Sequence, residues 1–420
     1  MALCTLLSPL SRANAAPDDE DAPDEGQNED SASKPKHKDA KPPKERHDSA
    51  GSGIIATVGL DTSFYQDTDA VGVFSPSVNI GIEKPTAGWN VHASYLVDVV
   101  SAASVDIVST ASQRWREVRN AGTLSAGYET GDTGLNVFGS FSREPDYLSL
   151  TGGLGFTQYF DQKNVVFQAN YTYGHDQAGR SGTPFSVYEH LINTHFANAG
   201  LSFVLDRSTV MVLMADAVFE RGDTSKPYRY VPMFAPGVAP SIQRGAPIDL
   251  VNEERLPERP LEQVPLARDR YALTWRYLHR YEASTIRFDE RVYADTWGQR
   301  ASSTDLRYLA DVSRRVMMGP HLRFHAQSAV DFWQRAYVAK RGPDYGGWYL
   351  PALRTGDREL GALFTTTAGG SMQIAIGSDE RPTEWMLGFM ADGGWTNYLD
   401  AIYITQRFAM YGGMTLEAEL

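Results

Sequence analysis

Polar and apolar positions alternate along two long stretches of the chain. In 285–297, one set of alternate positions carries Arg287, Asp289, Arg291, Tyr293 and Asp295, and the other carries Ile286, Phe288, Glu290, Val292 and Ala294. The pattern returns in 321–333, where His321, Arg323, His325, Gln327 and Asp331 alternate with Leu322, Phe324, Ala326, Val330 and Phe332. Successive side chains of a strand point to opposite faces. Each stretch therefore predicts a strand with one polar and one apolar face.

About sixteen such strands can be drawn along the chain, most of them at least as long as the roughly 9–11 residues that a tilted strand needs to cross a bilayer. They lie near 53–65, 72–84, 88–100, 119–129, 134–144, 148–160, 164–175, 193–205, 209–221, 269–281, 284–297, 302–314, 320–333, 358–376, 383–397 and 401–416. We therefore expect an all-β fold, a transmembrane antiparallel up-and-down β-barrel of about sixteen strands, with fourteen as the alternative count. Glu290, on the apolar face, is an exception that a local bulge or a depth near the membrane surface would explain.

The lengths of the connections support this architecture. Every second connection is short and carries turn residues, as in Lys84-Pro85-Thr86-Ala87-Gly88. The long connections, near 101–118, 176–192, 222–268 and 334–357, all belong to the other set. Bacterial barrels have short periplasmic turns and longer extracellular loops. The sequence therefore predicts extracellular long loops and periplasmic termini, and it disfavours a soluble sandwich.

The N-terminal residues differ in composition from the rest of the chain. Residues 1–16 resemble a secretory signal without its basic start, and they end in the cleavage-like Ala13-Asn14-Ala15. Residues 17–52 are first acidic and then rich in Lys and Pro, which predicts a disordered periplasmic tail. The single cysteine, Cys4, lies in the predicted leader. We expect export to the bacterial outer membrane, with the barrel formed by 53–420.

Composition narrows the set of partners. The net charge of −13 gives no reason to expect nucleic acid. No run of 18 apolar residues is present, which excludes a helical membrane protein. The expected partners are the lipid and lipopolysaccharide of the outer membrane and, during insertion, the assembly machinery. The final residues 411–420 alternate as its C-terminal signal does, although Leu420 replaces the usual aromatic end. Nothing in the sequence defines an oligomeric state.

An internal repeat is the most distinctive local motif. Two copies of Asp-x-Val-Ser-x-Ala-Ser begin at Asp98 and Asp106, where a strand enters a long loop. One interpretation is that Asp and Ser side chains shape this loop through bonds to the backbone. The alternative is a cation or polyol site built from Asp98, Ser101, Asp106 and Ser109, in which the oxygen ligands would suit Ca²⁺ or Mg²⁺ rather than zinc. The sequence predicts no other metal and no cofactor.

This repeat, together with residues 61–69, 73–76 and 114–119, resembles an uncharacterised bacterial outer-membrane β-barrel family catalogued as domain of unknown function 3570. The resemblance covers about 53–420. It implies a barrel in the outer membrane of Gram-negative bacteria. It implies no activity, and no catalytic residues follow from it.

A ladder of charged residues occupies the polar face of the later strands: Arg276, Arg287, Asp289, Arg291, Arg307, Asp311, Arg323, His325 and Asp331. One interpretation is a hydrated wall held by ion pairs between strands. The other is a pore lining whose excess of arginine selects anionic solutes. The two interpretations are compatible.

The expected function is that of a porin-like channel for small hydrophilic solutes, with anions favoured by the arginines. The alternative is a plugged surface barrel that binds a partner through its outer loops, of which the proline-rich 222–268 is the longest. We expect no enzyme. His175, His190 and His195 flank a loop with Ser181 and Ser186, but no nucleophile motif accompanies them.

Overall fold

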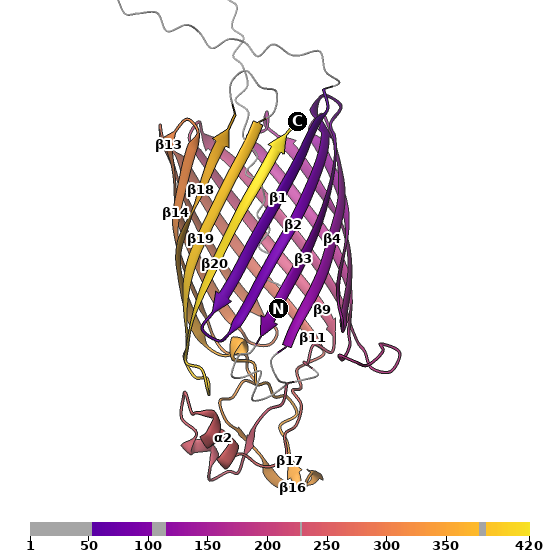
Figure 1. Ribbon diagram of the computed structural model, residues 1–420, viewed down its shortest axis with the longest axis vertical. Helices are drawn as coiled ribbons and strands as arrows, with labels where there is room; N and C mark the ends of the chain where they lie inside the picture. The colour runs from indigo at the N-terminus through magenta and orange to yellow at the C-terminus, as the bar shows by residue number, and fades with distance from the viewer. Residues whose placement is uncertain (1–52, 103–114, 227–228, 378–383) are drawn as a thin grey trace, which may run out of the picture. The chain divides into compact units, whose positions relative to one another are not determined.

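The computed structural model describes residues 53–102, 115–226, 229–377 and 384–420. The predicted leader and tail, 1–52, lie outside these residues, as do Asp106 and Ser109 of the repeat. The described residues form a closed antiparallel barrel, to which the long connections add a second, smaller body (Figure 1).

Sixteen strands form the barrel, which confirms the predicted fold. In chain order they are β1 Ile55–Asp67, β2 Val71–Lys84, β3 Trp89–Ala102, β4 Trp115–Thr130, β5 Thr133–Glu144, β6 Tyr147–Phe160, β7 Val165–Ala178, β8 His190–Asp206, β9 Thr209–Gly222, β11 Ala267–Arg280, β12 Ser284–Asp295, β13 Arg300–Ser313, β14 Val316–Gln327, β18 Leu363–Ile376, β19 Glu384–Tyr398 and β20 Gln406–Glu419. Each strand pairs with the next barrel strand, and β1 pairs with β20 to close the ring.

The two faces of the barrel differ in chemistry. Large apolar side chains are exposed at alternate positions, as at Leu60 and Phe64 on β1 or Leu135 and Val137 on β5. In water such a continuous apolar surface would be unfavourable, whereas a bilayer covers it. The intervening positions carry the polar and charged side chains and line the lumen. The alternation in the sequence therefore reports the outer and inner faces of one wall.

The connections differ between the two ends of the barrel. At one end, here called the short-turn end, lie 85–88, 131–132, 161–164, 207–208, 281–283, 314–315 and 377–383. The first of these contains η1 (Pro85–Ala87) and Gly88, whose φ of 72° is in the left-handed region that glycine adopts readily. The connections 103–114, 179–189, 223–266 and 328–362 all lie at the opposite, long-loop end.

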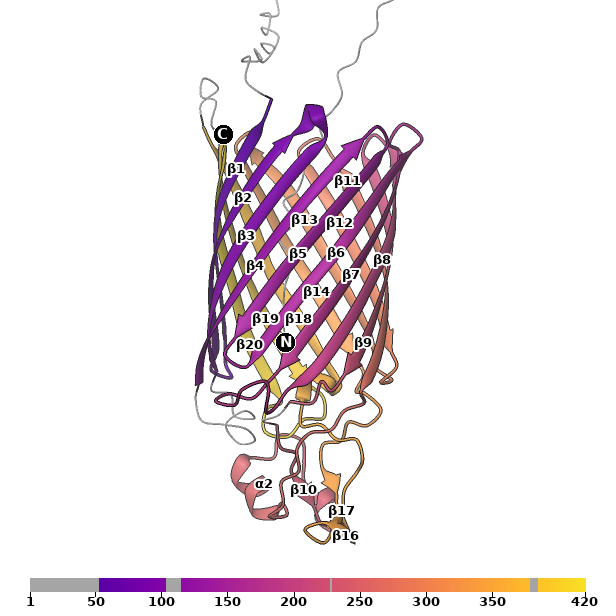
Figure 2. The same cartoon turned by 90° about the vertical axis from the view of Figure 1, so that its right-hand side faces the viewer.

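Two of these connections, 223–266 and 328–362, pack together beyond the long-loop end and form what we call the cap (Figure 2). It contains the parallel pair β10 (Met233–Phe234) and β15 (Tyr337–Val338), the hairpin β16 (Lys340–Tyr345) and β17 (Trp348–Tyr349), α2 (Ile248–Glu254), η2 (Ala239–Ser241) and η3 (Arg358–Leu360). Its core includes fully buried Met233, Phe234, Ile242 and Val251. The cap thus has an apolar core of its own.

No helix in the described part of the chain is long and apolar enough to cross a membrane.

The predicted strand 320–333 is too long. β14 ends at Gln327, and Val330, Phe332 and Trp333 pack with Val264 and Trp297 in the cap. For the same reason β18 and β20 begin later than predicted, at Leu363 and Gln406. Alternating apolar residues beyond a strand end here serve the core of the cap rather than the outer face.

Glu290 lies on the outer face near the middle of β12, and the ladder around it is regular. Neither a bulge nor a position near the membrane surface therefore explains it. Ser302 and Thr304, on the same face of β13, donate hydrogen bonds of 2.6 and 2.5 Å to its two carboxylate oxygens. These hydroxyls partly replace the water that the carboxylate loses in lipid.

Candidate functional site

The inner wall is the part of the molecule where charged side chains from many strands gather. Alternation and register place there Arg276 of β11, Arg287, Asp289 and Arg291 of β12, Arg307 and Asp311 of β13, and Arg323 and His325 of β14. Asp331 does not lie on the wall, because β14 ends four residues before it. Its backbone N–H instead donates to the Trp297 carbonyl at 2.8 Å, within the cap region.

Asp289 lies between two arginines. Arg276 is directly opposite Asp289 in the β11–β12 ladder and donates two hydrogen bonds to it, at 2.8 and 3.2 Å. Arg287, two residues earlier on the same strand, donates to the same carboxylate at 2.5 Å. Charge-assisted bonds of this kind hold both guanidinium groups against the wall. One carboxylate therefore offsets one of two positive charges.

Five other arginines of this wall are also paired. Arg291 donates at 2.5 Å to Asp216 of β9 and at 3.0 Å to Thr274 of the intervening β11. Four further pairs are Arg268 with Asp295, Arg270 with Glu220, Arg280 with Asp311, and Arg307 with Asp305. The predicted ladder is thus a network of ion pairs. Asp216 and Glu220 were not predicted as partners, because they lie on β9, which a long connection separates from β11.

His321 links three strands of the wall. Its Nε2 lies 2.9 Å from Asp392 Oδ1 on β19, and its Nδ1 lies 3.6 Å from Asp305 Oδ2 on β13. His321 itself is on β14, and its side chain is only 9% exposed. An imidazole between two carboxylates can hold them together when it is protonated.

Arg323 differs from its neighbours. Its side chain is exposed in the lumen, and no carboxylate of the described residues forms an ion pair with it. His325 lies two residues along the same face, where its ring contacts Ser303 Oγ at 2.7 Å and Gln327 Oε1 at 3.3 Å. Arg323 is therefore a cationic group that the network leaves free.

The opposite side of the wall, from β20 through β1 to β7, is acidic. Its inner positions include six carboxylates that have no arginine or lysine within 4.0 Å among the described residues. We call this set the acidic track: Glu83, Glu417, Asp61, Glu117, Glu144 and Asp176. None of these residues was predicted as a site residue. They occupy the alternate positions that face the lumen on successive strands, and this spacing is the sequence signal that could have revealed them.

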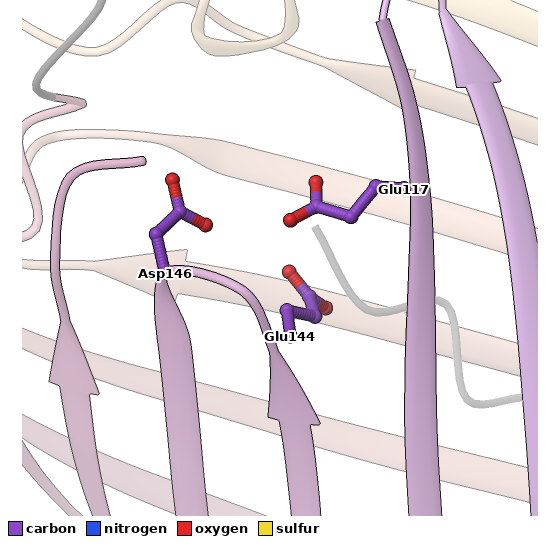
Figure 3. Close-up of side chains that lie close together, drawn as sticks. All are labelled: Glu117, Glu144 and Asp146. Atoms are coloured by element: carbon purple, nitrogen blue, oxygen red, sulfur yellow. The ribbon is translucent and has the colours of Figure 1, made fainter. Parts of the chain in front are cut away.

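Figure 3 shows that Glu117, Glu144 and Asp146 point toward one another. Their carboxylate oxygens lie within 4.8 Å of one another. Glu117 comes from β4, Glu144 ends β5, and Asp146 follows in the short connection to β6. Like charges this close repel each other and attract cations. This cluster lies at the long-loop end of the acidic track.

The predicted four-residue cation site does not assemble in the part that is described. Asp98 lies on the inner face of β3 and forms an ion pair with Arg119 of β4, with a hydrogen bond of 2.6 Å from Arg119 Nε. Ser101 is three residues further along the strand and therefore on the opposite face. Asp98 and Ser101 thus cannot bind one ion together.

A buried charged network holds the cap together. Arg229 forms ion pairs with Asp357 at 2.7 Å and with Glu262 at 3.3 Å, and Thr355 donates to Glu262 at 2.5 Å. Burial alone would raise the pKa of Asp357, but Arg229 outweighs it, so this pKa lies below its ordinary value. Although burial opposes it, the pKa of Arg229 is raised by Asp357 and Glu262. The ionised pair is therefore the stable state.

The same segment fastens the cap to the rim of the barrel. Arg358 donates to Asp69 in the β1–β2 turn at 2.5 Å. Glu359 accepts hydrogen bonds from Tyr398 of β19 at 2.6 Å and from Arg407 of β20 at 2.9 Å. These contacts join η3, which precedes β18, to β19, to β20 and to the turn between β1 and β2.

The histidines near the long-loop rim have partners other than the two serines of their loop. His175 contacts Asn193 at 2.9 Å, His195 contacts the Tyr171 hydroxyl at 2.7 Å, and His190 lies 3.6 Å from Asp223. His175 and His195 are on the outer face of the barrel.

A closed barrel with an apolar exterior and a polar lumen defines the class: an outer-membrane β-barrel. The chain belongs to the family described as "protein of unknown function (DUF3570)", whose model matches residues 94–381. This confirms the predicted resemblance, although the motifs at 61–76 lie before the matched residues. No curated protein matches the chain.

Several solved structures have similar folds at low identity. The mutant ferric enterobactin receptor PfeA of Pseudomonas aeruginosa is 10% identical over 82% of this chain and 54% of its own, with a TM-score of 0.39. CdiB of Acinetobacter baumannii is 9% identical over 86% and 60%, with a TM-score of 0.44. The toluene transporter TodX of P. putida is 9% identical over 88% and 90%, with a TM-score of 0.37. This chain spans about half the length of the receptor.

Proposed function

We propose that this protein is an outer-membrane channel that conducts small hydrophilic solutes. The observation that supports this most strongly is how the wall charges are arranged. In the described strands, each ion pair of the wall lies within one strand or joins strands that are adjacent or separated by a single strand, as in Arg276–Asp289 and Arg291–Asp216. Such pairs hold long side chains along the wall instead of across the lumen. A barrel of sixteen strands then leaves an aqueous path.

In this proposal the long-loop end faces the exterior, and the C-terminus and the residues before β1 are periplasmic. The cap then lies on the extracellular side, fastened to the rim through Arg358 and Glu359. Solutes would pass between the cap and the part of the rim to which it is not fastened. The proposal includes no catalytic step and no cofactor.

The cap supports a second candidate function, that of a surface barrel that binds a partner. Its apolar core and the partly buried Arg229–Asp357 pair make it a defined body and not a set of loose loops. Defined loops on a rigid scaffold commonly carry binding sites.

Single-channel conductance of the refolded protein in a planar bilayer tests the first proposal. We expect stable current steps. A correctly folded barrel, verified by circular dichroism and heat-modifiable migration, that carries no current would overturn the channel and favour the second candidate.

A further inference from the structure

We infer that the pore selects small cations, such as inorganic and short-chain ammonium ions, over anions. This inference rests on the proposed channel and names the class of its solutes. It comes from two independent features of the wall: the pairing of the arginines on β11–β14 and the unpaired carboxylates on the opposite side.

The arginine-rich side contributes little net potential. Arg268, Arg270, Arg280 and Arg307 each have their own carboxylate partner, and Arg291 has Asp216. The opposite charges of an ion pair largely cancel at a distance, and salt screens what remains within about 8–10 Å. The positive charges that remain are Arg323 and one charge of the Arg276–Asp289–Arg287 group. An excess of arginine on these strands therefore does not make the lumen positive.

The acidic track contributes unbalanced charge. Asp61, at the middle of β1, accepts hydrogen bonds from Asn79 and Ser77 of β2. These donors are neutral, so they stabilise the carboxylate without cancelling its charge. Glu117, Glu144 and Asp176 are likewise without an ion-pair partner among the described arginines and lysines. Asp98, in contrast, is neutralised by Arg119 and is not part of the track.

The track extends along the whole lumen. The ladder places Asp61 opposite Thr415 and Ser77, so Glu417 lies two residues toward the short-turn end and Glu83 six residues in that direction. Following the register through β2 and β3 to β4 places Glu117 four residues toward the long-loop end. At about 3.3 Å per residue, successive carboxylates are then roughly 7–13 Å apart along the strands. This spacing is close to the screening length, so their potentials overlap into one path.

The test is the reversal potential of the refolded wild-type protein in a planar bilayer under a gradient of KCl. We expect a reversal potential whose sign indicates that cations pass more readily than anions. Stable conductance with anion preference, or without preference, would overturn this inference and leave the channel standing. A folded but silent barrel would overturn both.

Variants of the acidic track, with one control on the outer face, sharpen the test. Asp61→Asn and the double variant Glu117→Gln/Glu144→Gln should both move the reversal potential toward zero. Glu290→Gln makes the same chemical change on the outer face and should leave the reversal potential unaltered. If Asp61→Asn does not fold, Glu83→Gln/Glu417→Gln removes the charges of the short-turn end instead. An unchanged reversal potential in folded track variants would overturn the inference, as would an equal shift in Glu290→Gln.

Discussion

Arg358 of the cap donates a 2.5 Å hydrogen bond to Asp69 in the first turn of the barrel, 289 positions earlier in the chain. The two side chains are only 11% and 5% exposed. Removing one partner of a buried pair leaves the other charge without compensation. This pair is therefore a main point at which the cap is fastened to the rim.

Replacing Asp69 with Asn should loosen the 328–362 connection while the barrel stays intact. The expected loss in the free energy of local opening is about 3 kcal/mol, typical of a broken buried pair. Hydrogen exchange and limited proteolysis of this connection would measure it. Arg341→Gln is the matched control, because Arg341 is exposed and stacks on Trp348 within the cap. Equal exchange in both variants would contradict the fastening role.

Acid should open the cap before it unfolds the barrel. The pKa of Asp357 lies below its ordinary value, so its contribution to stability is complete above the unfolded value of about 3.9 and is lost as the pH falls through the lower folded pKa. Proteolysis of the cap should therefore accelerate below about pH 4. Asp357→Asn should open the cap already at neutral pH and remove this acid dependence. An acid profile unchanged in the variant would refute the assignment to Asp357.

Asp289→Asn should shift ion selectivity toward anions, because it frees Arg276 and Arg287 together. The double variant Asp289→Asn/Arg276→Gln restores the net charge and should return the reversal potential most of the way to that of the wild type. Both measurements use the same bilayer recordings. A double variant that behaves like the single one would mean that charge is not the cause.

Glu290→Gln should stabilise the barrel in lipid, since it removes a charge from the middle of the outer face. The amide oxygen still accepts from one of the hydroxyls of Ser302 and Thr304, and the amide NH2 can donate to the other. The expected gain in the free energy of unfolding is about 1 kcal/mol, less than the cost of a basic residue at the same depth. Reversible urea unfolding in lipid vesicles measures it. A loss of stability would indicate that the carboxylate has a partner in the membrane.

The barrel was predictable from the sequence because one physical rule, alternation against lipid, applies along every strand. The rule failed where apolar residues with the same alternating spacing pack in the apolar core of the cap instead of facing lipid. Val330 and Phe332 alternate as on a strand, yet they pack in the cap because Gln327 ends the ladder. Alternation alone cannot distinguish lipid from a second apolar core.

The candidate site was only partly predictable. The alternation of the sequence places Arg276 and Asp289 on the inner face. Which residues lie opposite each other, however, depends on the register between strands. Arg291 and Asp216 are on strands separated by a long connection, so only the closed sheet reveals that they meet. Asp98 and Ser101, two of the four residues of the predicted cation site, lie on opposite faces for a simpler reason, since an odd spacing on a strand separates two side chains.

The seam between β1 and β20 has a consequence for biogenesis. These strands are the first and last of the barrel, and their ladder runs from Thr57↔Glu419 to Asp67↔Ala409. Hairpins can form locally as the chain emerges, but this ladder has the longest sequence separation in the ring and the largest closure entropy. Until it forms, two strand edges remain unpaired and prone to aggregation. Closing the ring is therefore the folding step that most needs a chaperone or an assembly factor. A chain interrupted before β20 could not complete this step.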